Sequence, residues 1–316
     1  MTRTSNPVYV TKDTARKIVD KYDNFLFDCD GVVWLDEDLI PGASSLLEYL
    51  TAHRKKHVAF VTNNSSKSRC EYLAKFQRLA IENVTLDMIY PTCYSAALEI
   101  RDVLHIPPKS KIWVLGDHGI EQELANLGYV VMGGTDTQLD DEFDAKSALL
   151  RVDPDVRAVV VGSTKSLNYM RIAATLQYLL YKNKSIPFIG TNIDKTYPGA
   201  DGLVLPAGGS VVSFMADTAQ RDFISVGKPS RRFLDLILRD RGFDRDRTLM
   251  VGDTLYTDVK FANDGDLGGG QGSLLVLSGG TTRDDLEAVV GLERDESLTP
   301  SYYTESLGHL MDLLRD

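Results

Sequence analysis

The sequence predicts an α/β fold built around a parallel sheet, and two features of the chain support this. Short apolar runs recur along the chain, and each is followed at once by polar residues and then by a segment with helical spacing. Runs of this length, with helices between them, are typical of buried parallel strands. Ligands bind beyond the carboxyl ends of such strands, so we expect the polar ends of the runs to meet in one place. The four runs with the most polar ends lie at residues 25–27, 58–61, 224–226 and 248–251.

Helices are expected between and after these strands. A proline and a serine open residues 231–241, which carry apolar side chains on one face, and Gly242 supplies a stop signal. The glycine-rich residues 265–272 are expected to form a flexible loop before a strand at 274–277. Residues 307–314 at the chain end have helical spacing and are expected to pack on the sheet.

The middle of the chain predicts a second domain. At 316 residues the chain is long enough for two domains of ordinary size. The stretch between the second and third runs has its own alternation of strands and helices. We therefore expect a core domain made of residues 1–95 and 223–316, interrupted by an inserted α/β cap domain at residues 96–222. Within the cap, strands are expected at 111–116, 158–161 and 186–189, and a helix at 166–181.

Composition and charge narrow the possible partners. The apolar fraction of 43% and the charged fraction of 25% are ordinary for soluble globular proteins. A net charge of -10 disfavours nonspecific binding to nucleic acid or to an anionic membrane, so neither is an expected partner. The three cysteines show no paired spacing, and no apolar run is long enough to span a bilayer. We expect a cytoplasmic protein.

Asp28 and Asp30 stand two residues apart at the end of the first predicted strand, where such residues tend to project to the same side. An aspartate is already ionised at neutral pH, and its phosphorylated form is an acyl phosphate that water can break down. The second aspartate can protonate a leaving oxygen and then deprotonate water. The same pair could also be an ordinary turn with satisfied side chains.

Two more carboxylates, Asp253 and Asp258, follow the run that ends at Gly252. Carboxylates facing a phosphate dianion repel it, so the site needs positive charge. A few hard oxygen ligands shared with phosphate favour Mg²⁺, which is the expected cofactor. Taken alone, this motif could also be the capped start of a helix.

Lys228 and the segment after Thr62 can supply binding groups for phosphate. Lys228 follows Gly227 and offers a point charge. Thr62, Asn63 and Asn64 give hydroxyl, amide and backbone donors where a strand passes into a helix, although an ordinary helix cap would look the same.

The order of these motifs resembles the haloacid dehalogenase superfamily, over nearly the whole chain. The stretches 25–32, 61–65 and 190–194 are similar to its 4-nitrophenylphosphatase and phosphoglycolate phosphatase branch, which has a large cap. The resemblance implies a Rossmann-like parallel-sheet core with an inserted α/β cap domain. The four matching motifs are Asp28-x-Asp30-Gly31, Thr62, Lys228, and Gly252-Asp253 with Asp258.

The resemblance also implies a role for each motif residue. Asp28 would be the nucleophile and a metal ligand, Asp30 the acid and base that lends its backbone carbonyl to the metal, and Asp253 a direct ligand. Asp258 would support the metal site and Lys228. Thr62 and Lys228 are also expected in catalysis, and Asn192 and Asp194 are expected to contribute to cap specificity. The expected substrate-binding residues are Gly31, Thr62, Asn63, Asn64 and Lys228.

The function implied is a Mg²⁺-dependent phosphatase that hydrolyses small phosphate monoesters through an aspartyl-phosphate intermediate. Phosphoglycolate-like metabolites are the expected substrates, with 4-nitrophenyl phosphate as an artificial one. The expected assembly is a homodimer formed through the cap. The alternatives are a phosphotransferase or mutase with the same intermediate, a phosphoprotein phosphatase, or an inactive regulatory binding protein.

Overall fold

The computed structural model of the chain describes residues 6–198, 203–291 and 295–315. By its contacts the chain divides into two compact units. The first unit consists of Met1–Thr62, Leu73–Tyr90 and Lys228–Asp316, and the second of Asn63–Tyr72 and Pro91–Gly227. The second unit thus includes a segment directly after Thr62 that the sequence assigned to the core. The domain boundaries at residues 96 and 222 stay a prediction.

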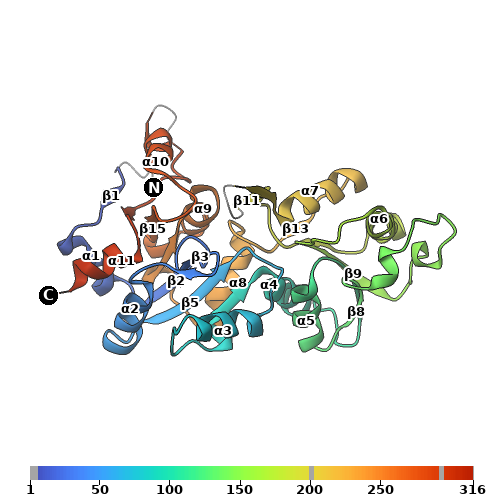
Figure 1. Cartoon of the computed structure of the whole chain (residues 1–316), viewed down its shortest axis with the longest axis horizontal. Coiled ribbons are helices and arrows are strands. Elements are labelled where there is room, and N and C mark those ends of the chain that lie inside the picture. Colours follow the sequence, from blue (N-terminus) through green and yellow to red (C-terminus); the bar gives the residue numbers. More distant parts are fainter. Residues whose placement is uncertain (1–5, 199–202, 292–294, 316) are drawn as a thin grey trace. The chain divides into compact units, whose positions relative to one another are not determined.

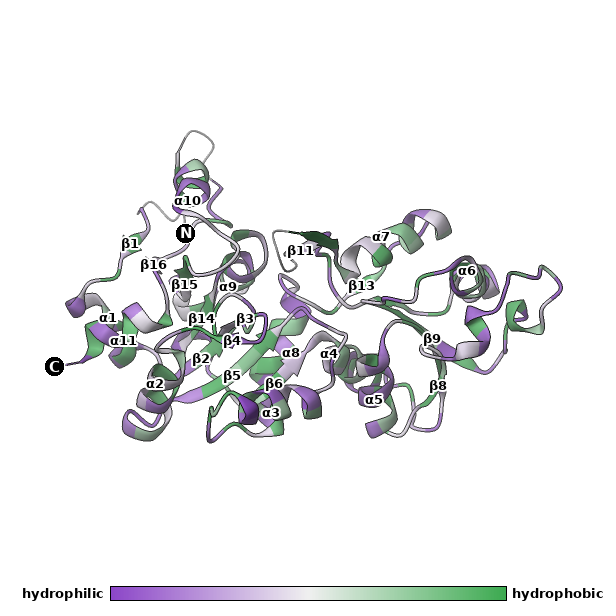
Figure 2. Ribbon diagram, viewed as in Figure 1, coloured by the Kyte–Doolittle hydropathy of each residue, from purple (hydrophilic) through white to green (hydrophobic). Residues whose placement is uncertain are grey.

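The first unit is built on a parallel sheet. In the described residues it has seven strands in the order β1-β16-β15-β14-β2-β5-β6, and the registers from β1 to β5 are all parallel. The interior strand β2 is buried along its whole length, and β5 appears largely in the hydrophobic colour in Figure 2. The α/β fold is therefore confirmed. The strands are β1 (Val8–Tyr9), β16 (Tyr302–Thr304), β15 (Ser273–Val276), β14 (Thr248–Gly252), β2 (Asn24–Phe27), β5 (His57–Thr62) and β6 (Ile89–Pro91).

Helices flank this sheet (Figure 1). Helices α1 and α2 both contact α11, and α8 contacts α9. Helix α8 has the predicted bounds, because Gly242 ends it with a left-handed φ of 65°. A short hairpin follows β2, formed by β3 (Trp34–Leu35) and β4 (Asp38–Leu39). The helices are α1 (Lys12–Lys21), α2 (Ala43–Glu48), α3 (Arg69–Arg78), whose start lies in the second unit, α8 (Arg231–Arg241), α9 (Lys260–Asp264), α10 (Arg283–Val290) and α11 (Leu307–Leu314).

The second unit has a parallel sheet of its own. Its described strands follow the order β13-β10-β9-β7-β8. Helix α6 begins at Tyr169 because the side chain of Asn168 accepts a hydrogen bond from the backbone of Arg171 at 2.9 Å. The strands are β13 (Ile224–Ser225), β10 (Phe188–Gly190), β9 (Val156–Val161), β7 (Lys111–Leu115) and β8 (Val130–Gly133), with a hairpin of β11 (Thr196–Pro198) and β12 (Val204–Pro206). The helices are α4 (Thr92–Leu98), α5 (His118–Asn126), α6 (Tyr169–Lys184) and α7 (Gly208–Ala219).

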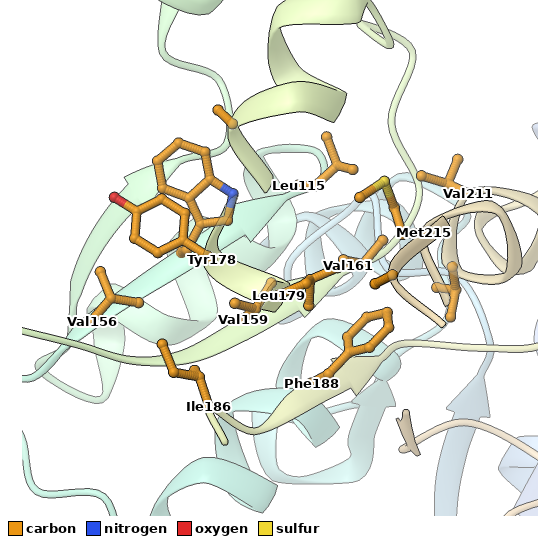
Figure 3. Close-up of a cluster of buried hydrophobic side chains, with 14 of the residues drawn as sticks. Leu115, Val156, Val159, Val161, Tyr178, Leu179, Ile186, Phe188, Val211 and Met215 are labelled. Carbon is orange, nitrogen blue, oxygen red and sulfur yellow. The ribbon is translucent and has the colours of Figure 1, made fainter. Parts of the chain in front are cut away.

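A dense apolar core lies between this sheet and helices α6 and α7 (Figure 3). The indole of Trp113 stacks on Tyr178 with ring centroids 4.4 Å apart, and its Nε1 donates a hydrogen bond to Thr175 Oγ1. Val159 and Leu179 are fully buried in the same cluster. Close packing of this kind makes the second unit a stable body on which side chains can be held in place.

Two sequence expectations were wrong. Residues 224–226 were expected in the core sheet, but β13 pairs with β10 in the second unit, because a short apolar run does not specify the strand with which it pairs. The glycine-rich residues 265–272 were expected to be a flexible loop. They instead form a short 3₁₀ turn, Leu267–Gly269, with Leu267 buried and with Gln271 accepting a hydrogen bond from Tyr22 Oη at its carbonyl. No helix in the described part of the chain is both long enough and apolar enough to cross a membrane.

Candidate active site

Asp28 is the first residue after β2, an interior strand of the first unit's sheet. Strand β2 lies between β14 and β5, and its four residues are all buried. The backbone N–H of Asp28 still donates to Val251 of β14, at 2.9 Å, which continues the ladder past the end of β2. The carboxylate of Asp28 is 14% exposed. A buried interior strand therefore places a largely buried carboxylate at the carboxyl end of the sheet.

Lys228 lies against this carboxylate. Its ammonium Nζ is 2.8 Å from Asp28 Oδ1 and 2.7 Å from Asp258 Oδ1, and it donates a third hydrogen bond to the carbonyl of Val61 at 2.9 Å. The side chain is 1% exposed. Burial lowers the pKa of Lys228, but the charges of Asp258 and Asp28 outweigh this and raise it above its usual range. Lys228 is therefore a fixed positive charge between two carboxylates.

Asp258 holds the loop that carries Asp253. Strand β14 ends at Gly252, and a single π-helical turn, Leu255–Val259, follows. Asp258 Oδ2 accepts hydrogen bonds from the backbone N–H groups of Asp253 and Thr254, each at 3.1 Å. With its other oxygen on Lys228, this 1% exposed carboxylate links the loop to the lysine. This π-helical turn explains why four residues separate Asp253 from Asp258.

Three carboxylates gather at this point. Oxygen atoms of Asp28, Asp253 and Asp258 lie within 4.8 Å of one another. Burial, together with the charges of Asp258 and Asp253, raises the pKa of Asp28 well above its usual value, although Lys228 opposes the shift. Burial and the charge of Asp258 raise the pKa of Asp253 to about 7. One lysine does not compensate three buried carboxylates, and hard oxygen donors at this spacing fit a divalent cation such as Mg²⁺.

Asp253 has a further neighbour that the sequence did not indicate, the loop after β15. Its Oδ2 accepts a hydrogen bond from the backbone N–H of Gly280 at 2.5 Å. Ser278 Oγ donates to the carbonyl of Gly31 at 2.8 Å. Gly31 has a φ of 82°, and a Cβ there would overlap Asp253 Oδ2. The signal that could have found this loop is two consecutive glycines, Gly279 and Gly280, shortly after the end of β15 at Val276, a strand of the same parallel sheet.

Asp30 lies outside the three-carboxylate cluster among the described residues. Its side chain is exposed, unlike that of Cys29, which is buried between the two aspartates of the motif. The indole Nε1 of Trp34 donates a hydrogen bond to Asp30 Oδ1 at 2.8 Å. Trp34 is a second residue that the sequence did not indicate, since its four-residue spacing from Asp30 has meaning only inside the tight turn that follows β2.

Thr62 and Asn63 are consecutive residues that belong to different units. Thr62 ends β5, next to β2 in the first sheet, and is 2% exposed. Asn63 is bound within the second unit, where its Nδ2 donates to Asp194 Oδ2 at 2.8 Å. The carbonyl of Asn63 accepts hydrogen bonds from Asn192 Nδ2 at 2.6 Å and from Thr92 Oγ1 at 2.9 Å. Asn192 and Asp194, expected to contribute to specificity, thus both contact the segment that follows Thr62.

The next two residues are also tied to the second unit or to their own turn. Asn64 Oδ1 accepts from the backbone N–H of Ser66 at 2.8 Å and from its hydroxyl at 2.7 Å. The hydroxyl of Ser65 is fully buried and accepts from the backbone N–H of Ser163 at 3.1 Å. The structure therefore brings the predicted residues together in two groups. The first unit gathers Asp28, Gly31, Lys228, Asp253 and Asp258, and the second gathers Asn63, Asn192 and Asp194.

Comparisons with known proteins agree with this geometry. A family model described as haloacid dehalogenase-like hydrolase matches residues 25–130, and a HAD-hydrolase-like model matches residues 225–310. The chain is 36% identical over 298 residues to the 4-nitrophenylphosphatase of Schizosaccharomyces pombe, covering 94% of this chain and 96% of the relative. It is 35% identical over 314 residues to phosphoglycolate phosphatase 2 of Arabidopsis thaliana, with 98% of each chain covered. It is also 34% identical to the glycerol-3-phosphate phosphatase of Gallus gallus over 309 residues, with 96% of each chain covered.

Solved structures show the same fold. The p-nitrophenyl phosphatase from Archaeoglobus fulgidus has a TM-score of 0.74 and 26% identity, covering 92% of this chain and 99% of that one. A glycerol phosphate phosphatase from Mycobacterium tuberculosis, solved in complex with magnesium, has a TM-score of 0.72 and 24% identity, covering 93% of this chain and 77% of that one. With family models over most of its length and several named phosphatases among its relatives, the chain belongs to the haloacid dehalogenase-like hydrolases and is a phosphatase, a phosphoric monoester hydrolase, of that family.

Proposed function

We propose that this phosphatase is Mg²⁺-dependent and hydrolyses small phosphate monoesters, with phosphoglycolate-like metabolites as substrates and 4-nitrophenyl phosphate as an artificial one. The observation that carries the proposal is the position of the Asp28 carboxylate at the end of β2. It lies 2.8 Å from the ammonium of the buried Lys228 and beside two further carboxylates. The printed names of its relatives, 4-nitrophenylphosphatase and phosphoglycolate phosphatase, support the substrate class.

The proposed ligands for the metal are the carboxylates of Asp28 and Asp253 and the backbone carbonyl of Asp30, with Asp258 in support. A bound Mg²⁺ would supply the positive charge that offsets both the carboxylates and the substrate phosphate. The magnesium complex of the Mycobacterium tuberculosis protein, similar in fold, is consistent with this choice. Asp258 contributes by holding the backbone of Asp253 and Lys228 together.

In the proposed reaction, Asp28 attacks the phosphorus of the ester with one carboxylate oxygen. The bond from phosphorus to the leaving oxygen breaks, and that oxygen keeps the electron pair and takes a proton from Asp30. In the second step water attacks the phosphorus of the aspartyl phosphate and gives a proton to Asp30. Inorganic phosphate leaves, and both carboxyl groups return to their starting state.

The remaining residues would bind and orient the substrate. Lys228 holds the carboxylate of Asp28 in one orientation and supplies charge next to it. Thr62, Asn63, Asn64 and Gly31, together with Lys228, are the proposed contacts to phosphate, and Thr62 is the last residue of β5, the strand next to β2. Asn192 and Asp194 are proposed to influence specificity from the second unit, through the contacts they make to Asn63.

The proposed setting is a cytoplasmic homodimer formed through the cap, with no nucleic-acid or membrane partner. The net charge of -10 supports the absence of nucleic-acid and membrane binding, because both partners are polyanions or carry anionic surfaces. Size-exclusion chromatography with light scattering would test the dimer, and monomeric protein at micromolar concentration would refute it.

The test of the proposed function is phosphate release from a panel of small phosphomonoesters, with and without Mg²⁺. Asp28→Asn is expected to lower turnover by about 10³-fold or more while circular dichroism and the unfolding midpoint stay close to the wild type, because the amide fills the same space but is not a nucleophile. Substantial hydrolysis by Asp28→Asn would refute the role of Asp28. An unreactive wild type across the panel would refute the metabolite class.

A further inference from the structure

We propose that Trp34 is a positioning residue for Asp30, and that its indole N–H fixes which carboxylate oxygen of Asp30 handles the proton. The proposal rests on the proposed function, in which Asp30 gives a proton to the leaving oxygen. It adds a residue that no motif of the sequence indicates. The contact that carries it is the hydrogen bond from Trp34 Nε1 to Asp30 Oδ1 at 2.8 Å.

Trp34 can hold Asp30 because its own position is fixed from several sides. Its side chain is fully buried, whereas Asp30 is exposed. The ring meets Phe76 edge to face, with centroids 4.9 Å apart, and the ammonium of Lys75 lies 4.4 Å above it. Lys75 is itself buried and donates a hydrogen bond to the carbonyl of Asp36, in the turn of the hairpin that Trp34 begins. An exposed aspartate with such a neighbour loses the rotamer freedom it would otherwise have.

The backbone of the same turn brings the two side chains together. Gly31 N–H donates to the carbonyl of Trp34 at 2.7 Å, and the N–H of Trp34 donates to the carbonyl of Cys29 at 3.2 Å. The residue after Asp30 is therefore bonded directly to the residue whose indole reaches the carboxylate. This closed turn brings the indole to Asp30, and the contacts of the ring with Phe76 and Lys75 hold it there.

The hydrogen-bonding chemistry of the indole determines which role each carboxylate oxygen of Asp30 can take. An indole N–H only donates, so Oδ1 of Asp30 must accept. In this arrangement Oδ2, the oxygen that does not accept from Trp34, is the one that carries the acidic proton of Asp30. As the bond from phosphorus to the leaving oxygen breaks, that oxygen keeps the electron pair and takes the Oδ2 proton. A general acid contributes about 10²- to 10⁴-fold when it is well placed, so a loss of placement should cost a measurable part of this.

In a purely structural interpretation of the same contact, Asp30 only accepts a hydrogen bond that the buried indole N–H needs. The two readings differ in how a loss depends on the leaving group. An alkyl phosphate such as glycerol 3-phosphate has a basic leaving oxygen that needs a proton, whereas 4-nitrophenolate leaves readily without one. A structural defect would lower the rates of both substrates, but a misplaced acid lowers mainly the rate of the alkyl ester.

The experiment compares kcat/KM of wild type and Trp34→Phe on glycerol 3-phosphate and 4-nitrophenyl phosphate. This parameter reports the steps up to release of the leaving group and so isolates the acid role of Asp30. Phenylalanine keeps an aromatic ring in the pocket and removes the N–H. We expect kcat/KM to fall by about 10- to 100-fold on glycerol 3-phosphate and by less than about 3-fold on 4-nitrophenyl phosphate. Equal losses on both substrates, or no loss on either, would overturn the proposal.

The chain offers a matched control in its other tryptophan. Trp113 is also buried and also donates through Nε1, to Thr175 Oγ1 at 2.9 Å in the second unit. Trp113→Phe is therefore the same chemical change at a similar site, and it is expected to leave the ratio of the two kcat/KM values unchanged. A shift of that ratio in Trp113→Phe as large as in Trp34→Phe would count against the proposal.

Two further measurements keep the test decisive. In an Asp30→Asn background, Trp34→Phe is expected to have no additional effect on the ratio, because the residue it positions is gone. If Trp34→Phe folds poorly, 3-benzothienylalanine at position 34 keeps the bicyclic shape and removes the N–H, and the same change of ratio is expected. A wild type that hydrolyses neither substrate would refute the proposed function, whereas an active wild type with equal losses in the variant would refute only the role of Trp34.

Discussion

Replacing Asp253 with asparagine is expected to stabilise the metal-free protein above neutral pH, although the change removes a proposed metal ligand. Asp253 is 6% exposed, and its carboxylate shares a small space with those of Asp28 and Asp258. Burial and the charge of Asp258 raise its pKa from 3.8 to about 7. Above pH 7 and without metal, the folded protein must therefore keep a carboxylate charged where it would otherwise hold a proton.

The sign and size of this change in stability follow from the linkage between proton binding and folding. A carboxyl group with a raised pKa binds its proton more tightly in the folded state, so the contribution of Asp253 favours folding at low pH and is lost as pH rises from about 4 to about 7. The difference between 3.8 and about 7 corresponds to an upper limit of about 4 kcal/mol at 1.36 kcal/mol per pKa unit. Because Asp253 titrates together with its neighbours, and because asparagine keeps only part of the bonding to Gly280, we expect a gain of about 1 to 3 kcal/mol.

The assay is urea unfolding of wild type and Asp253→Asn in EDTA at pH 5 and pH 8. The midpoint of the variant should exceed that of wild type by less at pH 5, where the carboxyl group of folded wild type is largely protonated, than at pH 8, where that group is charged. Asp217→Asn, which changes an exposed carboxylate on α7, serves as a control and should show no such pH dependence. A variant less stable than wild type at pH 8, or a difference that does not grow with pH, would refute the reasoning.

Addition of Mg²⁺ should reverse the order of the two proteins. At a concentration of 100 Kd, a ligand that binds only the folded state stabilises it by about 2.7 kcal/mol. Wild type should gain about this much at pH 8, and Asp253→Asn should gain much less because one carboxylate ligand is gone. Equal gains for both proteins would show that Asp253 does not hold the metal.

Two further predictions concern Lys228 in this cluster and Asp194 in the second unit. Lys228→Met removes the positive charge between Asp28 and Asp258. The free energy of unfolding should therefore fall by about 3 to 5 kcal/mol at pH 8 and by less at pH 5, where the carboxyl groups can take up protons. Urea midpoints that fall equally at both pH values would contradict this. Asp194→Ala removes the acceptor for the amide of Asn63, so the ratio of kcat/KM on phosphoglycolate to kcat/KM on glycerol 3-phosphate should change, while Asp194→Asn, which keeps an acceptor, should keep the wild-type ratio. Losses of equal size on both substrates in Asp194→Ala would contradict a role of Asp194 in specificity.

Much of the fold could be predicted from the sequence because local patterns specify local structure. The bounds of α8 were predicted to the residue, since an apolar face is opened by a proline and a serine and closed by Gly242. The strands that lead to Asp28 and Asp253 were found because a central parallel strand is buried on both faces and reads as a continuous apolar run. The grouping of Asp28, Lys228, Asp253 and Asp258 was likewise predicted, and the structure brings the four together.

Pairing between strands was not determined by any local pattern. Residues 224–226 were interpreted as an apolar run like those of the core strands, although Ser225 stands in the middle, and β13 pairs with β10 in the second unit. An apolar run indicates that a strand is buried, but it does not specify the strand with which it pairs. The pairing depends on which strand edges are free once the chain folds in three dimensions. Lys228 is brought to Asp28 by the chain that leaves β13, and not by membership of the same sheet.

By itself, then, the sequence determined the fold class, the superfamily and the charged residues at the strand ends, because these depend on residue type and spacing along the chain. Only the tertiary structure decided how the residues around them are held. Gly280 bonds to Asp253 and Asp194 to Asn63 across separations that no motif spans, and Trp34 bonds to Asp30 inside a turn that no motif indicates. Such contacts are chosen by the closure of turns and the packing of side chains, which place distant residues within 3 Å of one another only after the chain has folded.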